Sequence, residues 1–321
     1  MDFRQTTILD LTQQVQTGQT SCKALVTAAL QNIHRLDPVI NAFCAVDDAR
    51  ALDEAAKIDQ RLAAGEHLPL AGIPFGVKDL EDAQGYITTF GSAFHTEDAP
   101  ALEDSELVRR LRAAGAIVVG KTNTPEFGYK GKTDNVPFGV TKNPWDLTRT
   151  PGGSSGGSSA ALAAGMVPLA TGSDGGGSIR IPAALCGLSG IKTSQGRVPN
   201  GGPKPTGSGL LTVKGPMTRR IRDAAFVLDQ CIGAEPTDIF SLPAPNAPWA
   251  PQLDGALPEA VIWSPTMGIT SCDAEILALC EGAIEQLRRA GVQVIEQETI
   301  WDKHPFADWL VFWTAARARA Q

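Results

Sequence analysis

The chain carries two stretches rich in glycine and serine: P-G-G-S-S-G-G-S-S at residues 151–159 and G-S-D-G-G-G-S-I-R-I-P at residues 172–182. Each stretch precedes a predicted helix, so each can direct unpaired backbone N–H groups and the positive end of that helix toward an anion. Consecutive glycines that end in a serine are what an oxyanion hole beside a nucleophile requires. A flexible linker is the plainer interpretation of the first stretch, but an alanine-rich helix follows it at once. The two stretches together therefore predict a shaped cavity.

Short apolar runs alternate with helical patterns on either side of these stretches. Caps and apolar spacing predict helices at residues 20–37, 49–64, 104–115, 158–164, 179–185, 218–228 and 273–290. Apolar runs predict strands at residues 70–78, 116–119, 166–171, 260–263 and 292–295. Asp37-Pro38 is expected to end the first of these helices, and Thr218 to cap the helix that follows it. Such alternation is typical of a layered α/β fold with helices on both faces of the sheet.

The proline- and alanine-rich residues 234–258 are expected to form a surface excursion rather than a domain boundary. The sequence contains no internal repeat. We therefore expect a single domain over residues 1–321.

Composition excludes several classes of protein. The 321 residues include 28 basic and 35 acidic side chains, a net charge of −7, whereas nucleic-acid binding requires a concentrated basic face. No run approaches the roughly 20 apolar residues of a membrane span, and the first residues lack the apolar core of a signal peptide. The six cysteines and four histidines are scattered without a metal-binding pattern. We expect a cytoplasmic protein without metal or cofactor, whose partner is a small molecule rather than nucleic acid or membrane, and which is able to form a homodimer.

Residues 115–122, Gly-Ala-Ile-Val-Val-Gly-Lys-Thr, match the G-x-x-x-x-G-K-[ST] pattern of phosphate-binding loops. That chemistry needs a flexible loop whose N–H groups surround a phosphate, followed at once by a helix. The middle residues here are apolar and mostly β-branched, and Pro125 follows shortly. The pattern therefore predicts a buried strand that ends near Lys121.

Residues 152–156 also match G-x-S-x-G, the nucleophile elbow of α/β-hydrolases. A Ser-His-Asp mechanism needs a later histidine, and the sequence offers only His304, close to the end of the chain. A lysine is the alternative base, because burial lowers the pKa of a lysine and leaves a neutral amine. Lys78 ends an apolar run and is the candidate, although most lysines at strand ends are simply solvated.

The motifs resemble those of the amidase signature family, in the same order along most of the chain. They are G-I-P-F-G-V-K-D (72–79), G-K-T-N-T-P-E-F-G (120–128), N-P-W-D (143–146), P-G-G-S-S-G-G-S (151–158), G-S-D-G-G-G-S-I-R-I-P (172–182), G-L-S-G-I-K-T-S-Q-G-R-V-P (187–199) and G-P-M-T-R (215–219). The resemblance implies a mixed, largely buried central sheet covered by helices on both faces.

The resemblance also implies a Ser–Ser–Lys triad. Ser178 would be the acyl-accepting nucleophile, and Ser154, which follows a cis peptide bond in such enzymes, would relay protons between Ser178 and Lys78. The implied reaction is hydrolysis of a carboxamide, with aryl amides and carbamates as candidate substrates.

Several further residues receive roles from the same resemblance. Backbone N–H groups of Gly175, Gly176, Gly177 and Ser178 would hold the oxyanion, and Gly128 would line the acyl pocket. The supporting residues are Ser155, Asp174 and Arg180, the last two as an ion pair. Gly175 departs from the Thr or Ile that relatives often carry at this position.

The relatives implied by the resemblance continue beyond Gln321, so the chain is expected to be C-terminally short. Two other functions are then open. One is the A subunit of a tRNA-dependent amidotransferase, and the other is an inactive truncated relative that acts as an interaction partner. Such A subunits tend to carry Met-Asp-Glu-Phe where this chain has Thr124-Pro125-Glu126-Phe127, and Gln in place of Ile181. Both differences favour the stand-alone amidase.

Overall fold

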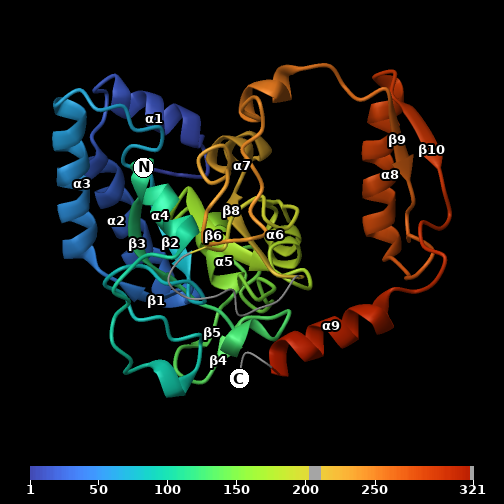
Figure 1. The fold of residues 1–321 in the computed structure, drawn as a ribbon, viewed down its shortest axis with the longest axis horizontal. Helices are drawn as coiled ribbons and strands as arrows, with labels where there is room; N and C mark the ends of the chain where they lie inside the picture. The colour runs from blue at the N-terminus through green and yellow to red at the C-terminus, as the bar shows by residue number, and fades with distance from the viewer. Residues whose placement is uncertain (202–210, 319–321) are drawn as a thin grey trace. The chain divides into compact units, whose positions relative to one another are not determined.

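The structure is a computed structural model that describes residues 1–201 and 211–318 (Figure 1). The chain divides into two compact units, Met1–Ala250 and Pro251–Gln321. The division falls within residues 234–258, which contain little regular structure besides the 3-10 helix η4 (Ala250–Asp254). The single domain expected for residues 1–321 stays a prediction.

A six-stranded sheet forms the centre of the first unit, in the order β1-β3-β2-β6-β8-β7. Strands β3 and β2, and β2 and β6, are parallel, whereas the β1, β8 and β7 pairings are antiparallel. The sheet is therefore mixed, as expected. The strands are β1 (Phe43–Val46), β2 (Pro74–Lys78), β3 (Ile117–Thr122), β6 (Leu169–Asp174), β7 (Ser189–Gly190) and β8 (Val213–Thr218). A small separate hairpin joins β4 (Asp134–Asn135) to β5 (Gly139–Val140).

Helices cover both faces of this sheet (Figure 1). They are α1 (Ile8–Gln16), α2 (Cys22–Ile40), α3 (Asp48–Ala63), α4 (Glu106–Ala113), α5 (Gly156–Ala163), α6 (Arg180–Cys186) and α7 (Ile221–Leu228), with the 3-10 helices η1 (Ala93–His95) and η2 (Glu126–Gly128). Side-chain caps explain two starts, because Ser21 accepts from the N–H of Ala24 and Asp47 accepts from the N–H of Arg50. No helix within the described residues is both long and apolar enough to cross a membrane.

Several expected boundaries are wrong. The strand expected at residues 70–78 begins only at Pro74, and the strand expected at residues 166–171 lies at Leu169–Asp174. Helix α2 continues through Pro38 to Ile40, because a proline in the last turn forfeits only one N–H and Asn41 closes the helix in a left-handed conformation. Thr218 does not cap α7, since it ends strand β8 and its hydroxyl donates to the carbonyl of Arg220. Strand β8 itself had no clear apolar signal, because Lys214, Gly215 and Pro216 interrupt it.

The second unit contains a βαβ arrangement. Strands β9 (Ala260–Trp263) and β10 (Gln293–Glu296) are parallel, and α8 (Ala274–Arg289) connects them. Asp273 caps α8 by accepting from the N–H groups of Glu275 and Ile276. Helix α9 (Phe306–Ala318) follows. The elements expected from residue 260 to residue 295 are therefore confirmed within one or two residues.

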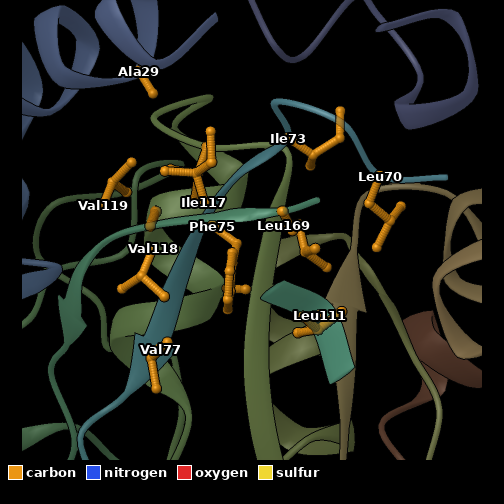
Figure 2. Packing of buried hydrophobic residues seen from close by; sticks show 14 of the residues in the cluster. Ala29, Leu70, Ile73, Phe75, Val77, Leu111, Ile117, Val118, Val119 and Leu169 are labelled. Atoms are coloured by element: carbon orange, nitrogen blue, oxygen red, sulfur yellow. The ribbon is translucent and has the colours of Figure 1, made fainter. Parts of the chain in front are cut away.

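Parallel pairing places the site. Strands β2 and β6 run in the same direction, with Phe75 opposite Leu169 and Gly76 opposite Ala170. Their carboxyl ends, Lys78 and Asp174, therefore lie at the same edge of the sheet. Every residue of β2, β3 and β6 is buried, and apolar side chains from these strands and from the covering helices fill the core (Figure 2). A fully buried strand pair thus carries a lysine and an aspartate to one edge.

The burial pattern predicts that alanine substitutions at two phenylalanines have very different effects on the free energy of unfolding. Phe75 is fully buried on β2, so Phe75→Ala should lower the free energy of unfolding by about 3–5 kcal/mol. Phe94 is 88% exposed, so Phe94→Ala should change it by less than about 0.5 kcal/mol. Denaturant unfolding of both variants measures the difference, and equal effects would contradict the placement of β2 in the core.

Candidate active site

The amine of Lys78 lies fully buried at the end of β2. It makes hydrogen bonds to three hydroxyl oxygens, those of Ser154 at 2.8 Å, Ser155 at 2.9 Å and Ser173 at 3.0 Å. The backbone N–H of Lys78 donates to the hydroxyl of Thr171 at 2.9 Å. Strand β6 therefore holds both the main chain and the side chain of this lysine, and the first glycine stretch holds its side chain.

The hydrogen bonds of Ser155 limit what each hydroxyl can do. Its hydroxyl donates to the carbonyl of Ser173 at 3.5 Å and accepts from the N–H of Ser173 at 3.4 Å. With its proton used there, Ser155 acts as an acceptor toward Lys78. A neutral amine has two N–H donors and one lone pair. In its neutral form the Lys78 amine would therefore have its lone pair directed at a hydroxyl of Ser154 or Ser173.

Ser173 was missed at the level of sequence. A signal existed, because Ser173 lies within the second glycine stretch and two residues after Thr171. Alternate residues of a strand face the same side of a sheet. Once β2 and β6 are known to be neighbours, Thr171 and Ser173 both face Lys78.

Ser154 follows a cis peptide bond to Gly153, as the resemblance implied. Neighbouring segments hold this turn, since the hydroxyl of Thr124 donates to the carbonyl of Ser154 at 2.9 Å and that of Thr133 donates to the carbonyl of Gly152 at 2.9 Å. Ser154 is only 2% exposed, so its hydroxyl is far less accessible from solvent than that of the partly exposed Ser178.

Ser178 is more accessible than the other serines of the site. It is partly exposed, and its carbonyl accepts from the N–H of Ser155 at 3.2 Å, which joins the two glycine stretches. Across residues 1–201 and 211–318, its hydroxyl has no hydrogen-bond partner. A reachable hydroxyl beside the Ser154 segment is what a nucleophile needs.

Asp174 and Arg180 form the expected ion pair. The guanidinium donates to the carboxylate at 2.9 and 3.0 Å, and the carboxylate also accepts from the N–H groups of Gly177 at 2.7 Å and Ile179 at 3.2 Å. Burial acts to raise the pKa of Asp174, but Arg180 and these N–H groups outweigh it, so the pKa is lowered. The pair holds the loop that carries Ser178 in one conformation.

The N–H of Gly177, expected to bind an oxyanion, has another partner in the structure. It points to Asp174, because a fully buried carboxylate must be hydrogen-bonded, and it is not available to a substrate. In the part of the chain that the structure describes, the N–H groups of Gly176 and Ser178 have no acceptor. These two groups are therefore the donors that the loop can offer to an oxyanion.

Gly128 borders Ser154. Its φ is +70°, and a Cβ at this position would lie 2.7 Å from Leu80 Cδ1 and 3.2 Å from Ser154 Oγ. The left-handed backbone favours a glycine here, and an added Cβ would lie tightly against Ser154.

The two misleading motifs are resolved by burial. Lys121 lies within strand β3, as predicted, and its buried amine contacts Asp79 at 2.9 Å rather than facing a loop. The elbow serine, Ser154, is buried against Lys78, and His304 is exposed in the second unit. The described residues contain no group of three or more metal-ligating side chains.

Comparison with known proteins identifies the family. The family model described as Amidase matches residues 24–320. AmiB2, an amidase-family protein of Mycobacterium tuberculosis (strain H37Rv), is 43% identical over 294 residues, which cover 91% of this chain and 62% of AmiB2. This chain belongs to the amidase signature family.

Two other comparisons are a solved structure and a further relative in sequence. The structure of a bacterial aryl acylamidase of the amidase signature family superposes with a TM-score of 0.85 at 32% identity, covering 91% of this chain and 61% of that one. The A subunit of the glutamyl-tRNA(Gln) amidotransferase of Roseiflexus castenholzii is 41% identical over 293 residues, which cover 91% of this chain and 59% of that relative. The chain thus spans about three fifths of the length of these relatives.

The Asp174–Arg180 pair predicts a loss of stability in acid. Because the folded pKa of Asp174 lies below the ordinary value of 3.8, its carboxylate stabilises the fold fully at neutral pH and progressively less as pH falls below about 4. Asp174→Asn should cost roughly 2–3 kcal/mol at pH 7, and the difference from the unaltered chain should shrink in acid.

Urea unfolding at several pH values measures this difference, with Asp53→Asn as the control, because Asp53 forms an exposed pair with Lys57. An Asp174→Asn penalty that stayed constant down to pH 3 would show that the negative charge is not what stabilises the loop.

Proposed function

We propose that this chain is an amidohydrolase that cleaves carboxamide bonds, with aryl amides and carbamates as candidate substrates, through an acyl-enzyme on Ser178. The observation that carries the proposal is the buried Lys78 amine, which lies 2.8 Å from the hydroxyl of Ser154. The turn that contains Ser154 is hydrogen-bonded to the backbone of Ser178 through the N–H of Ser155. A lysine without solvent around it is a competent base, because burial disfavours the charged form.

The chemistry follows from these positions. Neutral Lys78 accepts the proton of Ser154, which in turn accepts the proton of Ser178 as the Ser178 oxygen attacks the amide carbonyl. The tetrahedral oxyanion lies against the N–H groups of Gly176 and Ser178, each worth about 2.7–4 kcal/mol in comparable sites. Ser154 then passes a proton to the leaving nitrogen, the C–N bond breaks, and Lys78 returns its proton to Ser154. Water releases the acyl group by the same relay in reverse.

Similarity to the amidotransferase protein of Roseiflexus castenholzii supports a second candidate, in which the same chemistry supplies ammonia to partner subunits. Thr124-Pro125 and Ile181 favour the stand-alone hydrolase, since such proteins tend to differ at these positions. Hydrolysis of a simple anilide by the purified chain supports the first candidate. Amide cleavage seen only with partner subunits supports the second.

The triad is tested by reaction with a fluorophosphonate, followed by mass spectrometry of the modified peptide. The label should appear on Ser178 and be lost in Ser178→Ala. Lys78→Met should slow labelling at least about 100-fold, because no base remains. Ser154→Ala should retain a small rate, since water can replace the relay.

Ser159→Ala is the matched control. Ser159 lies buried on α5, and within the described chain its hydroxyl has no hydrogen-bond partner, so its removal should leave labelling unchanged. Labelling of the Ser178→Ala variant at the rate of the unaltered chain would refute the assignment of the nucleophile.

A further inference from the structure

A second buried lysine, Lys121, lies on the strand next to that of Lys78. In the parallel pairing of β2 with β3, Val77 lies opposite Lys121 and Lys78 lies opposite Thr122. Successive residues of a strand face opposite sides of a sheet. The hydroxyl of Thr122 contacts that of Ser158 on α5, on the side of the triad, whereas Lys121 contacts Thr88 on the other side. The side chains of Lys78 and Lys121 therefore lie on opposite faces of the sheet.

Lys121 is neutralised by the residue that follows Lys78. The amine of Lys121 lies 2.9 Å from the carboxylate of Asp79, and the two side chains are 0% and 1% exposed. Asp79 also accepts from the N–H and the hydroxyl of Thr89, and its own N–H donates to the carbonyl of Thr122 at 3.0 Å. The ion pair thus fixes the main chain one residue beyond Lys78.

We propose that the Asp79–Lys121 ion pair positions Lys78 and keeps the opposite side of the sheet electrically neutral, so that Lys78 can act as a proton acceptor. This inference rests on the proposed function of Lys78. Asp79 and Lys121 are positioning residues, since they act through the lysine and touch no substrate.

Other titratable groups surround Lys78 on neighbouring elements. Asp174, at the end of β6, is paired with Arg180, and Glu81, in the turn after β2, lies 3.7 Å from Lys214. Asp82 follows in the same turn. The thiol of Cys44 on β1 donates to the carbonyl of Lys121 at 3.4 Å. Asp174 and Glu81 keep their partners when only the Asp79–Lys121 pair is altered. The Cys44 thiol does respond, because its pKa is raised by burial and also depends on Asp79 and Lys121.

Removing one charge at a time should shift the titration of Lys78 in opposite directions. Lys121→Met leaves the Asp79 carboxylate, which Thr89 still stabilises, and this negative charge favours the ammonium form of Lys78. Asp79→Asn leaves the Lys121 ammonium, still bonded to Thr88, and disfavours that form. At an effective dielectric constant of about 20, a unit charge at a separation of about 10 Å changes a pKa by roughly one unit.

The measurement is the pH titration of the Lys78 side chain by NMR in protein labelled with 13C,15N-lysine. The Lys78 signal is the one missing from Lys78→Met. We expect the midpoint to rise by about one pH unit in Lys121→Met, to fall by about one unit in Asp79→Asn, and to return within about 0.3 unit in the double variant. Lys57→Met, which removes an exposed partner of Asp53, should leave the midpoint unchanged.

The pH dependence of fluorophosphonate labelling at Ser178 separates this inference from the proposed function. Opposite NMR shifts with no labelling of the unaltered chain would support the charge balance and overturn the proposed function. Normal labelling with equal midpoints in all variants would overturn the inference alone.

Thermal unfolding shows which variants fold. If the single variants do not fold, the double variant decides. It should keep the midpoint and label about tenfold more slowly, and a shifted midpoint there would overturn the inference.

Discussion

The site depends on the burial of one amine. The nitrogen of Lys78 is cut off from water, so its hydrogen bonds must come from the protein, and three serine hydroxyls provide them at 2.8 to 3.0 Å. Each of these serines belongs to one of the two glycine-rich stretches. The hydrogen bonds that the buried Lys78 amine requires therefore bring the two stretches together at the edge of the sheet where β2 and β6 end.

Two glycines of the site are explained by the space around them or by their backbone conformation. Gly128 stands where any Cβ would crowd Ser154, and it has a left-handed backbone. Gly177 is also left-handed, at φ +115°, and directs its N–H to Asp174. Small residues thus place polar groups around Ser154 and Ser178, while Asp174 and Arg180 hold the loop from behind.

Membership of the amidase signature family and the geometry of the site agree, but they carry different information. The family assignment rests on similarity along most of the chain. The roles of Lys78, Ser154 and Ser178 in the proposed reaction come from the motif resemblance, and their hydrogen bonds and accessibility support those roles. Lys121 shows why the distinction matters. Its segment matches a phosphate-binding motif, but in the structure its amine forms a buried ion pair with Asp79 on the side of the sheet opposite Lys78.

Much of this was accessible from sequence, because it depends on local order along the chain. Apolar runs marked β2, β3 and β9, a cap marked the start of α2, and the motif resemblance named Lys78, Ser154, Ser178, Asp174 and Arg180. Other features required tertiary structure. Ser173 meets Lys78 across 95 residues, the N–H of Gly177 is taken by Asp174, and Lys121 meets Asp79 across a strand pairing. Such contacts are set by which strands become neighbours and which face each side chain takes, and a linear pattern does not encode that register.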